Sequence, residues 1–146
     1  MAAAFVDTNI LLYAAGNAPS ERAKSAIARR LLKQIEVALS TQVLQEFYWV
    51  ATRPHKLAFT HEEAMAFVNV WKLFRVQAIS LGVVEDALVL CRDFRINYWD
   101  AAILAAARHL DCRTLYTEDL TNGQDYGGVK VINPFLAEPS FELLSA

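Results

Sequence analysis

The sequence contains few cysteines, no long apolar run and almost no net charge. Its two cysteines, Cys91 and Cys112, lack the paired spacing of a zinc site, so we expect reduced and partly buried thiols. No apolar stretch approaches the roughly 20 residues needed to span a bilayer. The start at Met1 has no basic flank of the kind that precedes the apolar segment of a signal peptide. These absences predict a cytoplasmic protein with no membrane partner.

The net charge and the length of the chain indicate which kinds of protein it can be. A formal net charge of −2 argues against a broad basic surface that binds duplex DNA through many phosphates, although it leaves room for a local basic patch. The 146 residues, 55% of them hydrophobic, predict a single domain over residues 1–146 that buries a core on both faces of a sheet. No internal repeat or low-complexity segment is present in the sequence, and residues 136–146 are expected to form a peripheral tail.

Short apolar runs alternate along the chain with stretches whose apolar residues recur at helical spacing. The predicted strands cover residues 4–6, 37–39, 76–79, 114–116 and 129–132. Parallel strands need long crossover connections, which helices usually provide. We therefore predict an α/β fold, a three-layer α/β/α sandwich around a mainly parallel sheet of about five short strands.

Two of the predicted strands end in the same way, on a hydroxyl and a carboxylate. The first runs directly into Asp7 and Thr8, and the fourth ends at Thr117 and Asp119. Loops at the carboxyl edge of an open α/β sheet form the crevice in which ligands bind, so both aspartates are candidate site residues. Asp7 has a second interpretation as a helix N-cap, because Asp readily accepts hydrogen bonds from free backbone N–H groups. A carboxylate has lone pairs for both tasks.

Two further acids lie on predicted helices. Glu46 falls on the flank of the apolar face of a helix expected over residues 40–53, so it needs a partner, which is either Arg53 or a metal ion. Asp100 occupies the third position of a helix that Asn97 would cap, where a carboxylate satisfies a backbone N–H or offsets the helix dipole. A role at the helix start alone would explain Asp100 without a catalytic function. However, Asp100 also lies on the side of the helix that is expected to face the core.

One crevice at this edge of the sheet would collect the carboxylates of Asp7, Glu46, Asp100 and Asp119. Such a group repels itself strongly unless the acids are protonated or neutralised by cations. Hard divalent ions with oxygen ligands, Mg²⁺ or Mn²⁺, suit it best. Because such ions activate water and stabilise the charge that develops in phosphoryl-ester hydrolysis, the four acids predict a metal-dependent hydrolase in which they are both metal ligands and catalytic residues.

Four stretches of the chain, in this order, resemble the PIN-domain ribonucleases, and among them the VapC-type toxins of bacterial type II toxin–antitoxin pairs. They are an opening with Asp-Thr-Asn at residues 5–11, a helix start at 40–48, a Tyr-Trp-Asp-Ala-Ala element within 97–103 and a Thr-x-Asp ending within 115–119. The resemblance implies Mg²⁺- or Mn²⁺-dependent cleavage of RNA by the same four acids. It also implies that Asn9 and Thr117 order the acids, and that the protein is a homodimer inhibited by a small antitoxin.

Two details of this prediction stay open at the level of the sequence. Glu118 and Asp125 are alternatives to Asp119 for the last acid, because both are close to it in the chain. Substrate RNA is expected to contact the basic residues that follow the Glu46 helix, with exposed aromatic side chains stacking on unpaired bases. These basic residues are Arg53, His55 and Lys56.

Two rival functions come from other classes. A catalytically silent relative would keep the fold and the partner-binding groove, but it should have lost acids, and none of the four is missing. An aspartyl-phosphate enzyme would use Asp7 as a nucleophile. Phosphatases of that kind usually have a second acid where this chain has Asn9, and no lysine directly follows the strand at 114–116.

Overall fold

The computed structural model describes residues 3–136, which form six α-helices and a six-stranded sheet. The strands are β1 (Ala3–Val6), β2 (Glu36–Ser40), β3 (Arg75–Gln77), β4 (Thr114–Tyr116), β5 (Asp125–Tyr126) and β6 (Val129–Ile132). The helices are α1 (Thr8–Ala15), α2 (Arg22–Gln34), α3 (Thr41–Ala51), α4 (His61–Trp71), α5 (Leu81–Phe94) and α6 (Tyr98–His109), with a 3-10 turn, η1 (Pro19–Glu21). The peripheral tail expected at 136–146 lies outside the described residues except for Leu136.

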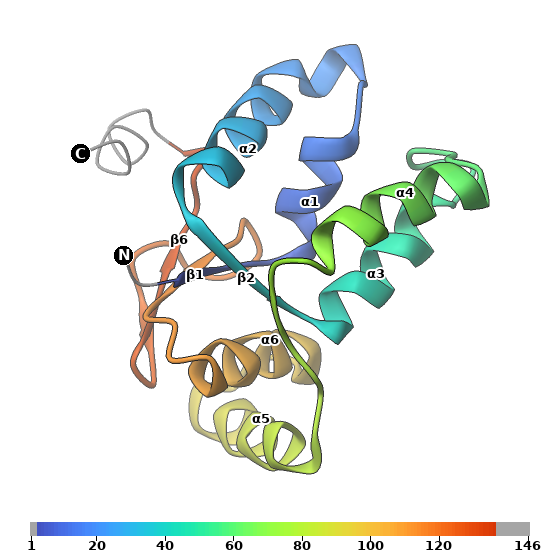
Figure 1. The fold of residues 1–146 in the computed structure, drawn as a ribbon. Coiled ribbons are helices and arrows are strands. Elements are labelled where there is room, and N and C mark those ends of the chain that lie inside the picture. Colours follow the sequence, from blue (N-terminus) through green and yellow to red (C-terminus); the bar gives the residue numbers. More distant parts are fainter. Residues whose placement is uncertain (1–2, 137–146) are drawn as a thin grey trace.

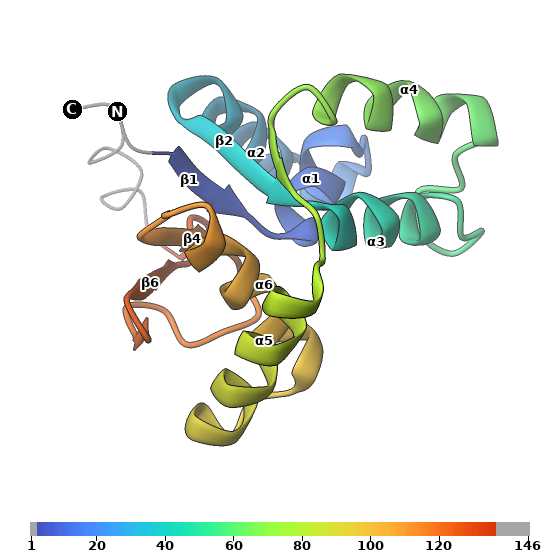
Figure 2. The same cartoon turned by 60° about the horizontal axis from the view of Figure 1, so that its bottom comes forward.

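The strand order is β3-β2-β1-β4-β6-β5, and every neighbouring pair is parallel except β5 with β6. Helices α1 and α2 lie on one side of the sheet, and the packed pair α5 and α6 lies on the other (Figures 1 and 2). Helices α3 and α4 form a further pair beside α1 (Figure 1). This arrangement confirms the predicted three-layer α/β/α fold with a mainly parallel sheet.

The core consists of the strands and of the helix faces that cover them. The central strand β1 is buried along its whole length, as expected for a parallel strand that is covered on both faces. Helix α6 is buried over seven consecutive residues, five of them alanine, which lets it lie close to both the sheet and α5. Phe47 of α3 is fully buried and makes an edge-to-face contact with Trp71 at 4.5 Å between ring centroids. Both sides of β1 are therefore firmly packed.

The sixth strand, β5, was not predicted from the sequence. Gly127 and Gly128 form a two-residue connection between β5 and β6, and both have positive φ, at 64° and 100°. Two-residue hairpins favour such turns because their twist matches that of the flanking strands, and glycine adopts them without steric cost. Residues 123–128, expected to be a loop, therefore contain a short antiparallel edge strand in which Tyr126 pairs with Val129.

Most other boundaries agree with the pattern of the sequence. Thr60 and Glu63 form a capping box at the start of α4, with each side chain bonded to the backbone N–H of the other. Strand β3 ends at Gln77, although the prediction extended it to residue 79. Helix α3 ends at Ala51, although the prediction extended it to residue 53. Cys91 and Cys112 are free thiols, as predicted. Within residues 3–136, no helix has the length and apolar character needed to cross a membrane.

Candidate active site

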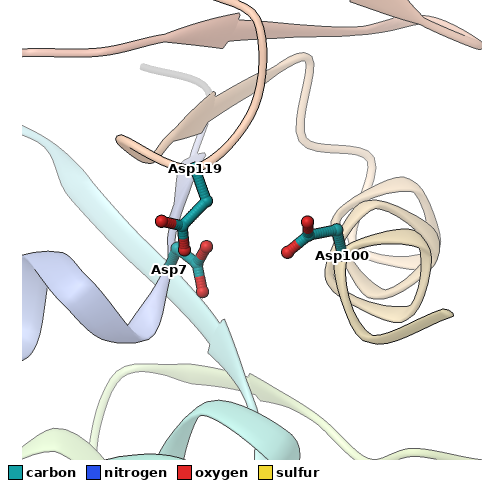
Figure 3. Close-up of side chains that lie close together, drawn as sticks. All are labelled: Asp7, Asp100 and Asp119. Atoms are coloured by element: carbon teal, nitrogen blue, oxygen red, sulfur yellow. The ribbon is translucent and has the colours of Figure 1, made fainter. Parts of the chain in front are cut away.

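Three aspartates converge at the carboxyl edge of the sheet, and each comes from a different element. Asp7 follows β1, Asp119 lies in the loop after β4, and Asp100 is in the first turn of α6. Strands β1 and β4 are parallel neighbours, so the residues that follow them emerge side by side. One carboxylate oxygen from each aspartate lies within 4.8 Å of those of the other two, and the three side chains point toward a common space (Figure 3).

Asp7 is the buried member of this group, with only 6% of its surface exposed. Its Oδ1 accepts a hydrogen bond from the backbone N–H of Thr8 at 2.7 Å, which makes it the N-cap of α1 as one interpretation predicted. Its Oδ2 accepts from the hydroxyl of Thr117 at 2.8 Å. The pKa of Asp7 is raised from 3.8 to about 7, mainly by burial and in smaller part by the charges of Asp119 and Glu46, against the lowering effect of these two bonds. A nearby cation would reverse this shift.

Thr117 and Asn9 connect the buried aspartate to the exposed one. The Thr117 oxygen accepts from the backbone N–H of Asp119 at 3.1 Å and from Asn9 Nδ2 at 3.2 Å, while its own proton goes to Asp7. Asn9 Nδ2 also donates to Asp119 Oδ2 at 3.1 Å. The amide orientation of Asn9 follows from these two acceptors. Both residues expected to order the acids therefore contact them, and the site combines residues about 110 positions apart in the chain.

Asp100 is half-buried and lies in the first turn of α6, which Asn97 caps. Its backbone N–H donates to Asn97 Oδ1 at 2.9 Å, and its Oδ2 accepts from Asn97 Nδ2 at 2.7 Å. Burial raises the pKa of Asp100, the Asn97 bond lowers it, and the negative charge of Asp119 raises it again. The bond to Asn97 uses one carboxylate oxygen and leaves the other available toward Asp7 and Asp119.

Glu46 lies beside the three aspartates but outside the tightest group. Its Oε1 accepts from Gln42 Nε2 at 3.1 Å and from Thr8 Oγ1 at 3.4 Å. Burial raises the pKa of Glu46, these two bonds lower it, and the charges of Asp100 and Asp119 raise it. Arg53, one of the two partners considered for Glu46, instead stacks on the ring of Trp49 at 3.7 Å and donates Nε to the Trp49 carbonyl. Within residues 3–136 no ion pair joins Arg53 to Glu46.

The two alternative acids have other partners. The carboxylate of Glu118 bonds Tyr13 Oη at 2.7 Å and Lys24 Nζ at 3.1 Å. Asp125 lies in β5, where it accepts from the backbone N–H of Gly128 at 2.8 Å. Neither belongs to the group of acids whose oxygens lie within 4.8 Å of one another, whereas Asp119 does. The geometry therefore places Asp119, and not its neighbours, with Asp7 and Asp100.

A cavity of about 350 Å³ opens between α1, α2 and the loop after α3, and none of the three aspartates lines it. Asn9, Tyr13 and Glu118 line one side of it, and the loop residues His55 and Lys56 line the other. Two of the three basic residues expected to contact RNA thus face the same space as Asn9. The guanidinium of Arg53 is engaged by Trp49 and is not part of this lining.

Tyr13 and Lys24 were not predicted as site residues. Tyr13 lies four residues after Asn9 on α1, so helical spacing alone places both on one face. The contact of Lys24 with Glu118 joins residues 94 positions apart, and nothing local in the sequence marks it.

The donor set suits a hard divalent cation. All three close ligands are carboxylates, and no nitrogen or sulfur donor joins them in the described part of the chain. Mg²⁺ and Mn²⁺ prefer such oxygen ligands, while Zn²⁺ usually takes imidazole or thiolate as well. The raised pKa values of Asp7, Asp100 and Glu46 reflect burial first and, after it, the negative charges of neighbouring carboxylates. A cation bound among them would compensate those negative charges.

Structures of known proteins with the same fold come from toxin–antitoxin systems. A toxin–antitoxin complex from Klebsiella pneumoniae contains a chain with 24% identity and a TM-score of 0.66, over 90% of this chain and 98% of that one. Mycobacterium tuberculosis VapC20, a toxin that cleaves the sarcin-ricin loop, shares 23% identity at a TM-score of 0.61, over 79% of this chain and 90% of that one. A chain of DNA-bound VapBC from Salmonella typhimurium shares 14% identity at a TM-score of 0.67, over 92% of this chain and 99% of that one.

At these identities the similarity establishes the fold. A search of curated protein sequences found no match. The family model of the PIN domain, in contrast, matches residues 4–121, a span that begins in β1 and ends just after Asp119 and so includes all four predicted acids. The order of the motifs, the topology of the sheet and this match agree, and the chain belongs to the PIN domain family.

Proposed function

We propose that this protein is a divalent-metal-dependent endoribonuclease and the toxin of a toxin–antitoxin pair. The observation that carries the proposal is the convergence of Asp7, Asp100 and Asp119, whose oxygens lie within 4.8 Å of one another at the carboxyl edge of the sheet. Three separate caps would need no such convergence. Membership of the PIN domain family and the toxin function of VapC20, which shares the fold, support the same activity.

Asp7, Asp100 and Asp119 would hold Mg²⁺ or Mn²⁺, and Glu46 stands beside them to complete the set of ligands or to orient water. When bound, such an ion polarises the phosphate, lowers the pKa of water and stabilises the charge of the transition state. The chain positions the acids in advance. Thr117 and Asn9 fix Asp7 and Asp119 through hydrogen bonds, and Gln42 and Thr8 fix Glu46. Such outer contacts hold ligands in place and make them better donors.

The substrate would be single-stranded or looped RNA. His55 and Lys56 face the cavity next to Asn9, where they can contact the phosphates of a strand that passes the aspartates. Trp99, directly before Asp100, is 64% exposed and offers a surface on which an unpaired base can stack. Arg53, the third basic residue, would have to leave its stacking contact with Trp49 before it could reach RNA.

A small antitoxin is the proposed protein partner, since complexes of toxin with antitoxin are among the structures that share this fold. We further propose that the toxin forms a homodimer, as the resemblance to the VapC-type toxins implies. Size measurement of the purified protein by light scattering, alone and with the product of an adjacent small gene, tests both partners.

Cleavage of a labelled RNA tests the proposed activity. The wild-type protein is expected to cut RNA in Mn²⁺ or Mg²⁺ and to lose this activity in EDTA. Asp7→Asn and Asp100→Asn should each reduce cleavage by at least about a hundredfold, as for the loss of a charge-stabilising group at an active site. Cleavage in EDTA, or full activity of both variants, would contradict the proposal.

The two rival functions predict different results in the same assay. A catalytically silent relative would cut no RNA with any metal, although it would still bind the antitoxin. An aspartyl-phosphate enzyme would form an acid-stable, alkali-labile phosphoprotein from a phosphate donor, and Asp7→Asn would abolish that label. The position of Asn9, whose amide bonds Asp119, argues against the second rival because it supplies an amide where those phosphatases use a second acid.

A further inference from the structure

A cluster of three side chains forms around Glu118, the residue that precedes Asp119. The carboxylate of Glu118 accepts a hydrogen bond from Tyr13 Oη at 2.7 Å and pairs with Lys24 Nζ at 3.1 Å. Lys24 also donates to Tyr13 Oη at 3.2 Å and lies 4.9 Å from the centre of the Tyr13 ring. Each of the three residues thus contacts the other two. Both carboxylate oxygens of Glu118 are used in these contacts.

Helix α1 holds the same loop at two points. Asn9 and Tyr13 are four residues apart, which is about one helical turn, so their side chains leave α1 on the same face. Asn9 donates to Asp119, and Tyr13 donates to the adjacent Glu118. Lys24 of α2 then ties the second contact to another helix. Asn9 therefore holds the loop at Asp119, and Tyr13 and Lys24 hold it at the adjacent Glu118.

Asp119 has particular need of such support. Unlike Asp7 and Asp100, it is exposed and belongs to a loop, between β4 and β5. It also lies close enough to Asp7 and Asp100 for its charge to raise the pKa of each. Like charges at this range repel one another, so a free loop would move Asp119 outward before a cation binds. Contacts that fix the loop oppose this movement.

We propose that Lys24 and Tyr13, acting through Glu118, are positioning residues that hold Asp119 in the metal site. The proposal rests on the proposed function, since it assumes that Asp119 is a ligand. It assigns a role to three residues that do not touch the reacting atoms, and it excludes Glu118 as a metal ligand. Loss of the cluster should weaken metal binding by about tenfold, the lower end of the range for groups that orient metal ligands.

The charge of Lys24 makes the test decisive. Lys24→Met removes a positive charge near the site, so simple electrostatics predicts that Mn²⁺ binds more tightly to the variant. Loss of positioning predicts the opposite, weaker binding. Tyr13→Phe removes one hydroxyl without changing charge, and it should weaken binding in the same direction. Lys24→Arg keeps the charge and a donor, so it should stay within about twofold of the wild type. Lys33→Met removes the same charge from an exposed position on the same helix and is the matched control.

The measurement is the dissociation constant of Mn²⁺, obtained at pH 8 from the electron paramagnetic resonance signal of the free ion, for the full-length protein without RNA. Thermal unfolding in EDTA accompanies each variant. The expected result is about tenfold weaker binding for Lys24→Met, weaker binding for Tyr13→Phe, no weakening for Lys33→Met, and a melting temperature near that of the wild type. Lys24→Met and Glu118→Gln should show no additional loss when combined, because each breaks the same contact.

Three outcomes would overturn the proposal. Binding by Lys24→Met that is equal to or tighter than that of the wild type would mean that the cluster does not position Asp119. Weak binding by Glu118→Gln alone, with Lys24→Met and Tyr13→Phe unchanged, would mean that Glu118 acts at the metal itself. If Lys33→Met weakened Mn²⁺ binding as much as Lys24→Met does, the effect would come from the loss of a positive charge on the helix and not from the cluster. Equal binding of Mn²⁺ by the wild type and Asp100→Asn would instead contradict the proposed metal site itself. This result distinguishes a failure of the proposed function from a failure of the positioning role.

Discussion

Replacing Asp7 by Asn should stabilise the metal-free protein above neutral pH while it abolishes metal binding. Burial raises the pKa of Asp7 from 3.8 to about 7. Asp7 therefore favours the folded state fully only below its unfolded pKa, and this contribution is lost as the pH rises through about 7. At about 1.4 kcal/mol for each pKa unit, the ionised carboxylate costs the folded protein roughly 4 kcal/mol at pH 8.

Asparagine avoids that cost but loses one hydrogen bond. Its Oδ1 can still accept from the backbone N–H of Thr8, whereas its Nδ2 cannot accept the proton that Thr117 gives to Asp7. A hydrogen bond to a charged group contributes about 1.5–3 kcal/mol, which leaves a net gain of roughly 1–3 kcal/mol for Asp7→Asn at pH 8. At pH 5 the folded carboxyl is protonated while the unfolded one is still ionised, so only about 2 kcal/mol of that cost remains. The lost neutral hydrogen bond, about 0.5–1.5 kcal/mol, offsets much of it, and the variant should be close to the wild type in stability.

Urea unfolding in EDTA at pH 5 and pH 8 measures how the effect of Asp7→Asn on stability depends on pH. Glu85→Gln, which removes a carboxylate from an exposed position of α5, is the control and should respond little to pH. Addition of Mn²⁺ should then stabilise the wild type and leave Asp7→Asn unchanged, because only the wild type binds the ion. An Asp7→Asn variant that is destabilised equally at both pH values would refute the reasoning from burial and repulsion.

Three further substitutions test particular contacts. Thr117→Ala removes the hydroxyl that joins Asp7 to Asp119, so urea unfolding should show a loss of about 1–3 kcal/mol and calorimetry should show weaker Mn²⁺ binding. Phe47→Ala empties a fully buried site and should lower the free energy of unfolding by about 3–5 kcal/mol, while Phe47→Leu should cost clearly less. Thr60→Ala breaks the capping box and should cost about 0.5–2 kcal/mol, with RNA cleavage unchanged.

The sequence was sufficient for the features that depend on local pattern. Apolar runs identified the five parallel strands, because strands covered on both faces have little polar surface. The predicted cap at Asn97 marked the start of α6, since few side chains can accept hydrogen bonds from a free helix end. The same logic predicted that Asp7 caps α1, and the structure confirms that it also faces the other acids.

The features that could not be predicted depend on contacts through space. The edge strand β5 has only two residues and forms through its pairing with β6, so no periodic pattern marks it. The bonds of Lys24 and Tyr13 to Glu118 join segments that only the sheet brings together. The open choice among acids near residue 119 was likewise decided by the direction of each side chain, which the sequence does not specify.

The expected partners of individual polar residues were the least predictable part. Arg53 was considered a partner of Glu46, but the ring and carbonyl of Trp49, on the preceding turn, hold its guanidinium. Gln42, one turn before Glu46, takes that place instead. Several neighbours can satisfy a long polar side chain at similar cost, so the choice depends on small differences in geometry. The roles of Arg53, His55 and Lys56 toward RNA stay predictions.

The central claim is that Asp7, Asp100 and Asp119 form one metal site, and an anomalous difference map from crystals grown with Mn²⁺ tests it most directly. We expect a peak that is coordinated by these three carboxylates, with Glu46 beside it, and the loss of that peak in Asp100→Asn crystals. A protein that binds no Mn²⁺ in such crystals, or that binds it only away from the three aspartates, would contradict the account.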